Sequence, residues 1–209
     1  MGRRGSSAGG GELVQEAARI LVEESLTDYG IAKRKAAERL GLSTRAALPD
    51  NARIEAEVIA YQRLFGGAAY TQRLRSLRQT AVQAMKLLVS FDPRLTGAVI
   101  SGAISDSHRV QLHAFPDKAE LVDIFLADRG FEVDADERDY RYSDGRIERI
   151  PLARFKAGDI GVDVALFEPG QERHAPLSPT QGTPSKRLTL VQAEALAGEA
   201  IEGVLDFSA

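Results

Sequence analysis

The sequence predicts an α+β protein, with a helical N-terminal region followed by a mixed β-sheet that has helices packed on one side. Over residues 12–90, apolar side chains recur at helical spacing. From Gly97 onward the spacing changes to strand-like alternation, and turn residues separate the segments. Residues 1–11 are rich in glycine and serine and predict a disordered tail. We therefore expect a tail over 1–11, a basic helical region over 12–90 and an α+β domain over 91–209.

The helical region predicts four helices, over residues 12–26, 28–40, 50–65 and 70–89. Asp28 and Asp50 stand where the side chain of an N-cap accepts a hydrogen bond from the first helical turn. Gly41 suits the left-handed conformation that commonly ends a helix. These signals divide the region into short helices joined by loops.

The second part predicts strands over 97–101, 108–115, 131–142, 147–155 and 159–169, with a helix over 117–130 after the second strand. Asp144 and Gly145 indicate a hairpin turn. A proline-rich loop follows over 168–187 and leads to a last helix, for which Thr189 and Gln192 form a capping box. The mostly apolar strand around Asp163 is typical of the centre of a sheet.

The composition of the chain excludes several kinds of site and of protein. The 209 residues contain no cysteine, which excludes disulfides and thiolate metal sites and favours a reducing, cytoplasmic location. No apolar run reaches the roughly 20 residues that a membrane span needs, so we expect no membrane partner. Charge is uneven along the chain, because residues 1–90 carry a net charge of +5 and residues 91–209 one of −8. This asymmetry indicates that the first part meets an anionic partner.

Polar residues alternate with apolar ones on two of the predicted strands. Arg109, Gln111 and His113 do so on one strand, and Asp163 stands between two valines on a later strand. Because side chains on a strand alternate between faces, we expect all four on one face of the sheet. A solvated strand shows the same alternation, so that interpretation stands beside a functional one.

The order of elements, with "ISG" at 100–102 and "GVDVALF" at 161–167, resembles the nucleotidyltransferase fold of the DNA polymerase β type. The resemblance covers about residues 70–167. It implies that Asp163 and Asp106 are catalytic and hold Mg²⁺, and that a nucleoside triphosphate binds nearby. The nucleotide-binding residues that it implies are Ser101, Gly102, Ser105, Arg109, Gln111 and His113.

The chain departs from that family where two carboxylates alternate on the second strand, since Arg109 and Gln111 occupy this stretch. Arginine does not bind Mg²⁺, and glutamine is a weak neutral ligand. Two functions therefore remain. One is nucleotidyl transfer to, or binding of, an RNA. The alternative is a non-catalytic module that binds nucleic acid or protein and keeps the fold without the metal site.

Basic residues gather on two predicted helices and indicate contact with the phosphates of a nucleic acid, for which RNA is the expected partner. A solvated helix face, or one that docks an acidic protein, has the same composition. The residues concerned are Lys33, Arg34, Lys35, Arg39, Arg73, Arg75 and Arg78.

Overall fold

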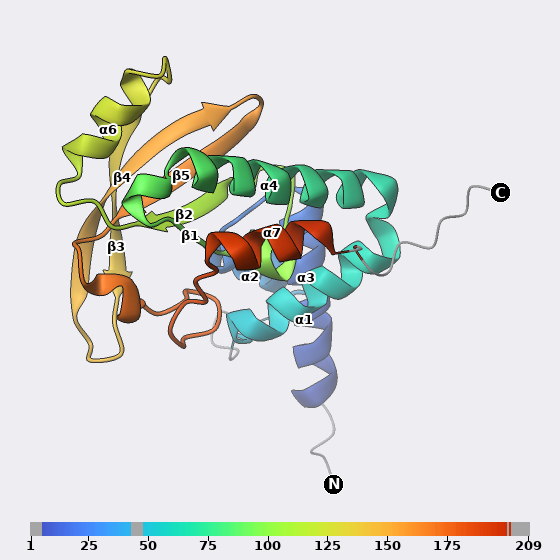
Figure 1. The fold of residues 1–209 in the computed structure, drawn as a ribbon. Coiled ribbons are helices and arrows are strands. Elements are labelled where there is room, and N and C mark those ends of the chain that lie inside the picture. The colour runs from blue at the N-terminus through green and yellow to red at the C-terminus, as the bar shows by residue number, and fades with distance from the viewer. Residues whose placement is uncertain (1–5, 43–47, 200, 202–209) are drawn as a thin grey trace, which may run out of the picture. The chain divides into compact units, whose positions relative to one another are not determined.

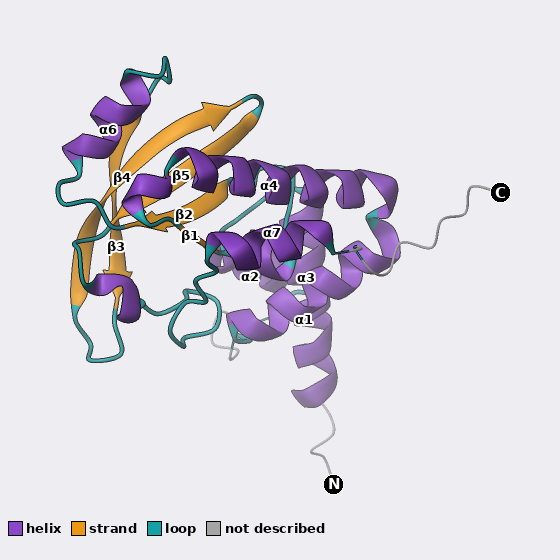
Figure 2. Cartoon of the chain, in the orientation of Figure 1, coloured by secondary structure: helices purple, strands orange, loops and turns teal. Residues whose placement is uncertain are grey.

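The computed structural model describes residues 6–42, 48–199 and 201. They form two compact units. Of the described residues, the first comprises 6–42, 48–73, Gly102–His108 and 201, and the second comprises Leu74–Ser101 and residues 109–199. The described residues contain seven α-helices and a five-stranded mixed sheet, so the predicted α+β class is confirmed (Figures 1 and 2). The units divide between Arg73 and Leu74, inside a helix, and the loop Gly102–His108 belongs to the first unit.

The first unit is helical. Its helices are α1 (Ser6–Glu23), α2 (Tyr29–Arg39), α3 (Asn51–Phe65) and the start of α4 (Gly67–Leu87). Asp28 accepts a hydrogen bond from the backbone N–H of Ile31, and Asp50 accepts one from that of Arg53, which confirms both predicted caps. Their core is aliphatic and includes Leu13, Ile20, Ala32, Ile54 and Val58.

Helix α1 starts earlier than the sequence predicts. Residues 6–11 were expected in the disordered tail, but the helix already begins at Ser6. Residues 1–5 of the expected tail lie outside the described residues.

The second unit contains the sheet. Its strands are β1 (Arg94–Thr96), β2 (Val110–Ala114), β3 (Asp134–Arg141), β4 (Ile147–Ala157) and β5 (Ile160–Leu166), in the order β1-β2-β5-β4-β3. Strand β5 is central, parallel to β2 and antiparallel to β4, and every one of its residues is buried (Figure 1). This confirms the central place that its apolar sequence predicts. Helices α5 (Ala98–Ser101), α6 (Glu120–Ala127) and α7 (Leu190–Gly198) complete the unit with the rest of α4.

The predicted strand over 97–101 is wrong. The strand lies earlier, at β1, and Gly97 then takes a left-handed φ of 81° that turns the chain into the single helical turn α5. Arg78 of α4 donates to the carbonyl oxygens of Val99 and Ile100, so side-chain hydrogen bonds replace the sheet ladder there. The polar loop therefore follows a helix.

The two faces of the sheet differ in chemistry. On one face Gln111 of β2 is the register partner of Asp163 of β5, which in turn faces Arg154 of β4. The opposite face is apolar and carries Val162 and Phe155, and the ring of Phe131, just after α6, lies 5.2 Å from that of Phe155. The face that carries Asp163 is the one that holds the candidate site.

Candidate anion-binding site

Arg109, Gln111 and Asp163 share one face of the sheet, as the alternation predicts. Gln111 is the direct neighbour of Asp163 in the parallel β2–β5 pair. Arg109 lies just before β2, and its Nε donates to Asp163 Oδ1 over 2.6 Å. The carboxylate of Asp163 thus points to polar groups and away from the apolar face.

Two further arginines from the β3–β4 hairpin reach the same carboxylate. Arg138 Nη2 lies 3.4 Å from Asp163 Oδ2, and Arg154 Nε lies 3.7 Å from Asp163 Oδ1. Arg154 also pairs with Asp136, with 2.6 Å between Nη1 and Oδ2. We call Arg109, Arg138 and Arg154 the arginine cluster. Three strands, β3, β4 and β5, and the start of β2 bring it together.

A glycine makes room for the cluster. A Cβ atom at Gly161 of β5 would lie 2.0 Å from Arg109 Nη1 and 2.2 Å from its Cζ. The guanidinium group of Arg109 therefore occupies the space that a side chain at position 161 would fill. Similarly, the side chain of Gln111 lies over Gly97, where a Cβ would be 2.3 Å from Gln111 Oε1.

The charges of the site favour an anion. Three guanidinium groups surround one buried carboxylate, and the carboxylate of Asp136 is the second acid in contact, which leaves a net charge of +1. Lys156, the register partner of Gly161, and Asp134, the register partner of Arg154, are both exposed on the same face, so their charges cancel and the net charge stays at +1. Guanidinium groups of this kind recognise phosphate and carboxylate groups.

The same arrangement does not fit Mg²⁺ at Asp163. A divalent cation needs several oxygen ligands, and the oxygens of Asp163 already face three cationic groups. Asp106, the other expected ligand, belongs to the first unit, in the loop Gly102–His108. Within the described ranges no three histidine, aspartate or glutamate side chains gather in a way that could hold a metal ion.

His113 shares the face of Gln111 but is buried, so it does not line an open pocket as expected. Its Nδ1 accepts a hydrogen bond of 2.9 Å from Arg187 Nε, and its ring packs against Phe167 and Tyr140. Burial, and then the charge of Arg187, holds the pKa of His113 well below its usual range. His113 is thus a neutral side chain that anchors the loop around Arg187.

Besides Gly102, the loop Gly102–His108 holds two expected site residues, Ser105 and Asp106, and both make contacts within the first unit. Ser105 is buried, and its Oγ lies 2.9 Å from His108 Nδ1 and 3.3 Å from the carbonyl oxygen of Leu26. Asp106 is exposed, and its carbonyl oxygen accepts a hydrogen bond from Arg73. The side chain of Ser105 therefore has a structural role in the loop.

The start of this loop shows a further departure from the expected phosphate contacts. Ser101 ends helix α5 and its Oγ donates back to the carbonyl oxygen of Ala98. Gly102 is buried with a left-handed φ of 86°, and its carbonyl oxygen accepts from the hydroxyl of Tyr70. Gly102 is needed here for backbone conformation.

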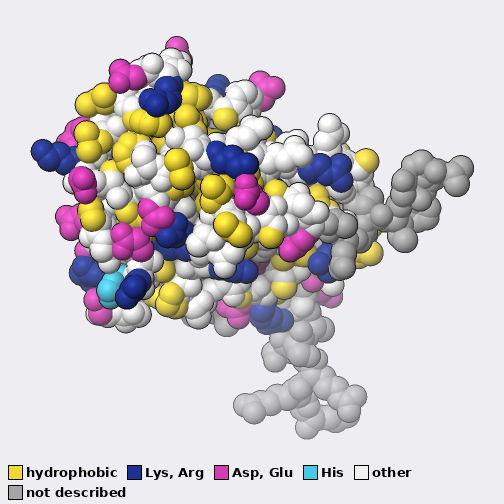
Figure 3. Space-filling view, viewed as in Figure 1, with side chains coloured by type: hydrophobic (Ala, Val, Ile, Leu, Met, Phe, Trp, Pro, Cys, Tyr) yellow, Lys and Arg dark blue, Asp and Glu magenta, His cyan; other side chains and the backbone are white. Residues whose placement is uncertain are grey.

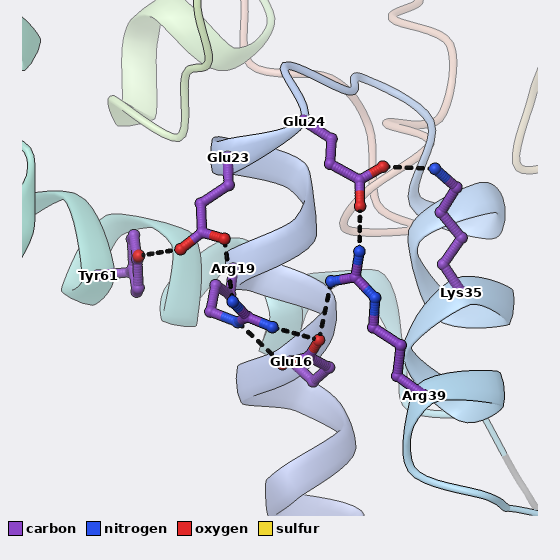
Figure 4. Close-up of polar contacts among 7 residues, drawn as sticks. All are labelled: Glu16, Arg19, Glu23, Glu24, Lys35, Arg39 and Tyr61. Atoms are coloured by element: carbon purple, nitrogen blue, oxygen red, sulfur yellow. Dashed lines mark hydrogen bonds and ion pairs between the residues drawn. The ribbon is translucent and has the colours of Figure 1, made fainter.

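Two of the basic residues of helix α2 form ion pairs with acidic residues of the first unit. Lys35 and Arg39 both bind Glu24, and Arg39 also binds Glu16, so they link α2 to the end of α1 (Figure 4). Hydrogen bonds from Arg19 lower the pKa of Glu16, and the hydrogen bond from Lys35 lowers that of Glu24. These two cations are therefore neutralised by neighbouring acids, whereas Lys33 is half-buried and Arg34 is exposed.

The arginines of α4 also differ from one another. Arg73 donates to the carbonyl oxygens of Asp106 and His108, and Arg78 is buried and donates to backbone oxygens. Arg75 is exposed. On the face drawn in Figure 3, basic side chains are scattered among acidic and hydrophobic ones and form no continuous patch. Arg73 and Arg78 thus stabilise the fold.

Sequence reasoning missed Arg138, Arg154, Lys156 and Gly161. The strands that carry them were predicted, and Arg154 and Lys156 show the strand alternation. The pairing that brings them to Asp163 depends on the register of β3, β4 and β5, which the alternation alone does not give.

The comparisons match the chain to no protein family and to no curated protein. In the part of the chain that the structure describes, no helix has the length and apolar character needed to cross a membrane.

Proposed function

We propose that the protein is a nucleotidyltransferase-like protein that binds a nucleotide through its phosphate groups and does not transfer it. The surroundings of Asp163 support this proposal most directly. A transferase of this type needs carboxylates that are free to hold divalent cations, whereas three arginines occupy this carboxylate. From the non-catalytic alternative that the sequence left open, a module that binds nucleic acid or protein, we keep the loss of the metal site, and we add the binding of a nucleotide.

We propose that the bound nucleotide is either free in solution or part of an RNA chain. Lys33, Arg34 and Arg75 remain as half-buried or exposed cations of the first part of the chain. Cations of this kind bind the phosphates of RNA in a way that weakens steeply with salt. The affinity for RNA should accordingly fall as the salt concentration rises.

Two assays test the proposal together. The first measures the binding of ATP and of a 5′-phosphorylated single-stranded RNA. The second follows the transfer of labelled nucleotide from ATP to RNA with Mg²⁺ present. We expect binding without transfer. Mg²⁺-dependent transfer would favour the catalytic alternative, and the absence of binding to either ligand would contradict the proposal.

A further inference from the structure

We infer that the arginine cluster binds a phosphate group directly, without a metal ion, and that Asp163 and Gly161 are the residues that position it. The phosphate belongs to a polyphosphate chain, such as that of a nucleoside triphosphate, or to the end of an RNA. In assigning the phosphate to a nucleotide, the inference rests on the proposed function.

Burial places the carboxylate beneath its arginines. The side chain of Asp163 is 6% exposed, whereas those of Arg109, Arg138 and Arg154 are 36% to 37% exposed. A ligand that approaches from solvent therefore meets guanidinium groups before it meets the acid. Asp163 compensates part of their charge and fixes their directions, which makes it a positioning residue.

The arginine cluster contains a hydrogen-bond donor that has no partner. Arg154 Nε is buried and has no hydrogen-bond partner, because its 3.7 Å separation from Asp163 Oδ1 is too long for a hydrogen bond. A buried donor without an acceptor is costly, so such donors are normally satisfied. The Arg154 side chain as a whole is 36% exposed, so a bound phosphate would accept from the N–H groups of its guanidinium that face solvent.

Gly161 determines where Arg109 lies. Its φ is not in the left-handed region, so the backbone alone does not require glycine at this position. Alanine would place Cβ 2.0 Å from Arg109 Nη1 and 2.2 Å from Cζ, so the guanidinium group at the end of this flexible side chain would have to move. Alanine at position 161 would therefore displace the guanidinium group of Arg109 from β5.

A phosphate group fits this arrangement better than a single carboxylate does. The cluster presents three separate guanidinium groups, with Lys156 exposed on the same face. A terminal phosphate offers several oxygens and up to two negative charges, so it can accept from more than one arginine at once. A carboxylate has only two oxygens and one negative charge, so it compensates less of the charge of the cluster than a terminal phosphate does.

The experiment is a calorimetric titration of the full chain with inorganic tripolyphosphate and with ATP, each in EDTA. We expect tripolyphosphate to bind without metal. Arg154→Ala should weaken its binding roughly tenfold or more, which is the loss expected for one charge-assisted hydrogen bond. Gly161→Ala should also weaken the binding of tripolyphosphate, because the added methyl group displaces the guanidinium group of Arg109.

Matched controls separate this effect from general ones. Arg149→Ala removes an arginine of the same strand β4 that points to the opposite face and pairs with Asp139, so it should leave binding unchanged. Gly198→Ala, at the end of α7, adds a methyl group where there is open space. If Arg154→Ala does not fold by circular dichroism, Arg154→Lys keeps the charge and removes the planar group, and the same loss is expected.

The outcomes distinguish this inference from the proposed function. If the protein binds tripolyphosphate but does not bind ATP, the phosphate site stands and the proposal that the ligand is a nucleotide is contradicted. Binding of ATP that is unchanged in Arg154→Ala and Gly161→Ala would keep the nucleotide and overturn the phosphate site. Binding of either ligand only when Mg²⁺ is present would also overturn the inference.

Discussion

Arg109 Nε donates a hydrogen bond of 2.6 Å to Oδ1 of Asp163. Arg109 directly precedes β2, and Asp163 lies in β5, the parallel neighbour of β2. The aspartate is 5% exposed, so its charge depends on the arginine for compensation. This contact explains why an acid is tolerated in a strand whose other residues are almost all apolar.

Asp163→Asn should lower the free energy of unfolding by about 1–3 kcal/mol, because the arginines lose the charge that compensates them. The loss stays below that of a fully buried pair, since the arginines are more than a third exposed. Urea denaturation measures it, with Arg149→Ala as the control for a surface ion pair. Equal stability of Asp163→Asn and the wild type would show that the aspartate does not serve the arginines.

The stability of the protein should fall as the pH drops from about 6.5 toward 4. Burial lowers the pKa of His108 from its usual 6.5 to about 4, and the charge of Arg73 acts in the same direction. The unfolded chain therefore takes up the proton first, and the stability from neutral His108 is complete above about pH 6.5 and lost as the pH falls through the folded pKa.

His108→Asn tests this dependence, because it removes the titrating ring and keeps an acceptor for the backbone N–H of Ser105, which donates to His108 Nδ1. Thermal midpoints measured between pH 7 and pH 5 should decline less steeply in this variant than in the wild type. His174→Asn, at an exposed histidine that directly follows the 3₁₀ segment Gln171–Arg173, is the control. Identical slopes for the wild type and His108→Asn would rule out the assigned role.

The basic residues of α2 should separate into two groups. Charge reversal of Lys35 and Arg39 to glutamate should destabilise the protein, since it places acids against Glu16 and Glu24. Reversal of Lys33 and Arg34 should leave stability nearly unchanged and weaken RNA binding, with a smaller dependence of affinity on salt. Denaturation and RNA titration of both double variants decide this. An RNA affinity that is the same in Lys33→Glu/Arg34→Glu and the wild type would contradict RNA binding by α2.

Gly145→Val should destabilise the β3–β4 hairpin by about 1 kcal/mol or more. Gly145 has a φ of 85°, and its N–H donates to the carbonyl oxygen of Tyr142 in the turn. The sequence predicts left-handed conformations at both Asp144 and Gly145, but only Gly145 has one among these two. Chemical denaturation measures the change, and a variant as stable as the wild type would show that the turn tolerates a β-branched residue.

The sequence predicted what depends on local patterns. The helices of the first unit, with the caps Asp28 and Asp50, and the central strand around Asp163 follow from periodicity and capping chemistry. The shared face of Arg109, Gln111 and Asp163 follows from strand alternation.

What the sequence did not predict depends on long-range contacts. Arg138 and Arg154 reach Asp163 only through the register of three strands. Ser105 belongs with the first unit because Leu26 and His108, one of them far away in the sequence, provide its hydrogen-bond partners. Lys35 and Arg39 are neutralised by Glu16 of α1 and by Glu24, which directly follows α1. The number of basic residues on α2 therefore overstated the positive charge available to bind RNA.

The central claim is that Asp163 serves the arginine cluster and not a metal ion. The measurement that tests it most directly is the dissociation constant of ATP for the wild-type protein, first in EDTA and then in excess Mg²⁺. The account predicts binding in EDTA at least as tight as in Mg²⁺, because the cation competes with the arginines for the phosphates. Binding that appears only when Mg²⁺ is added would contradict it.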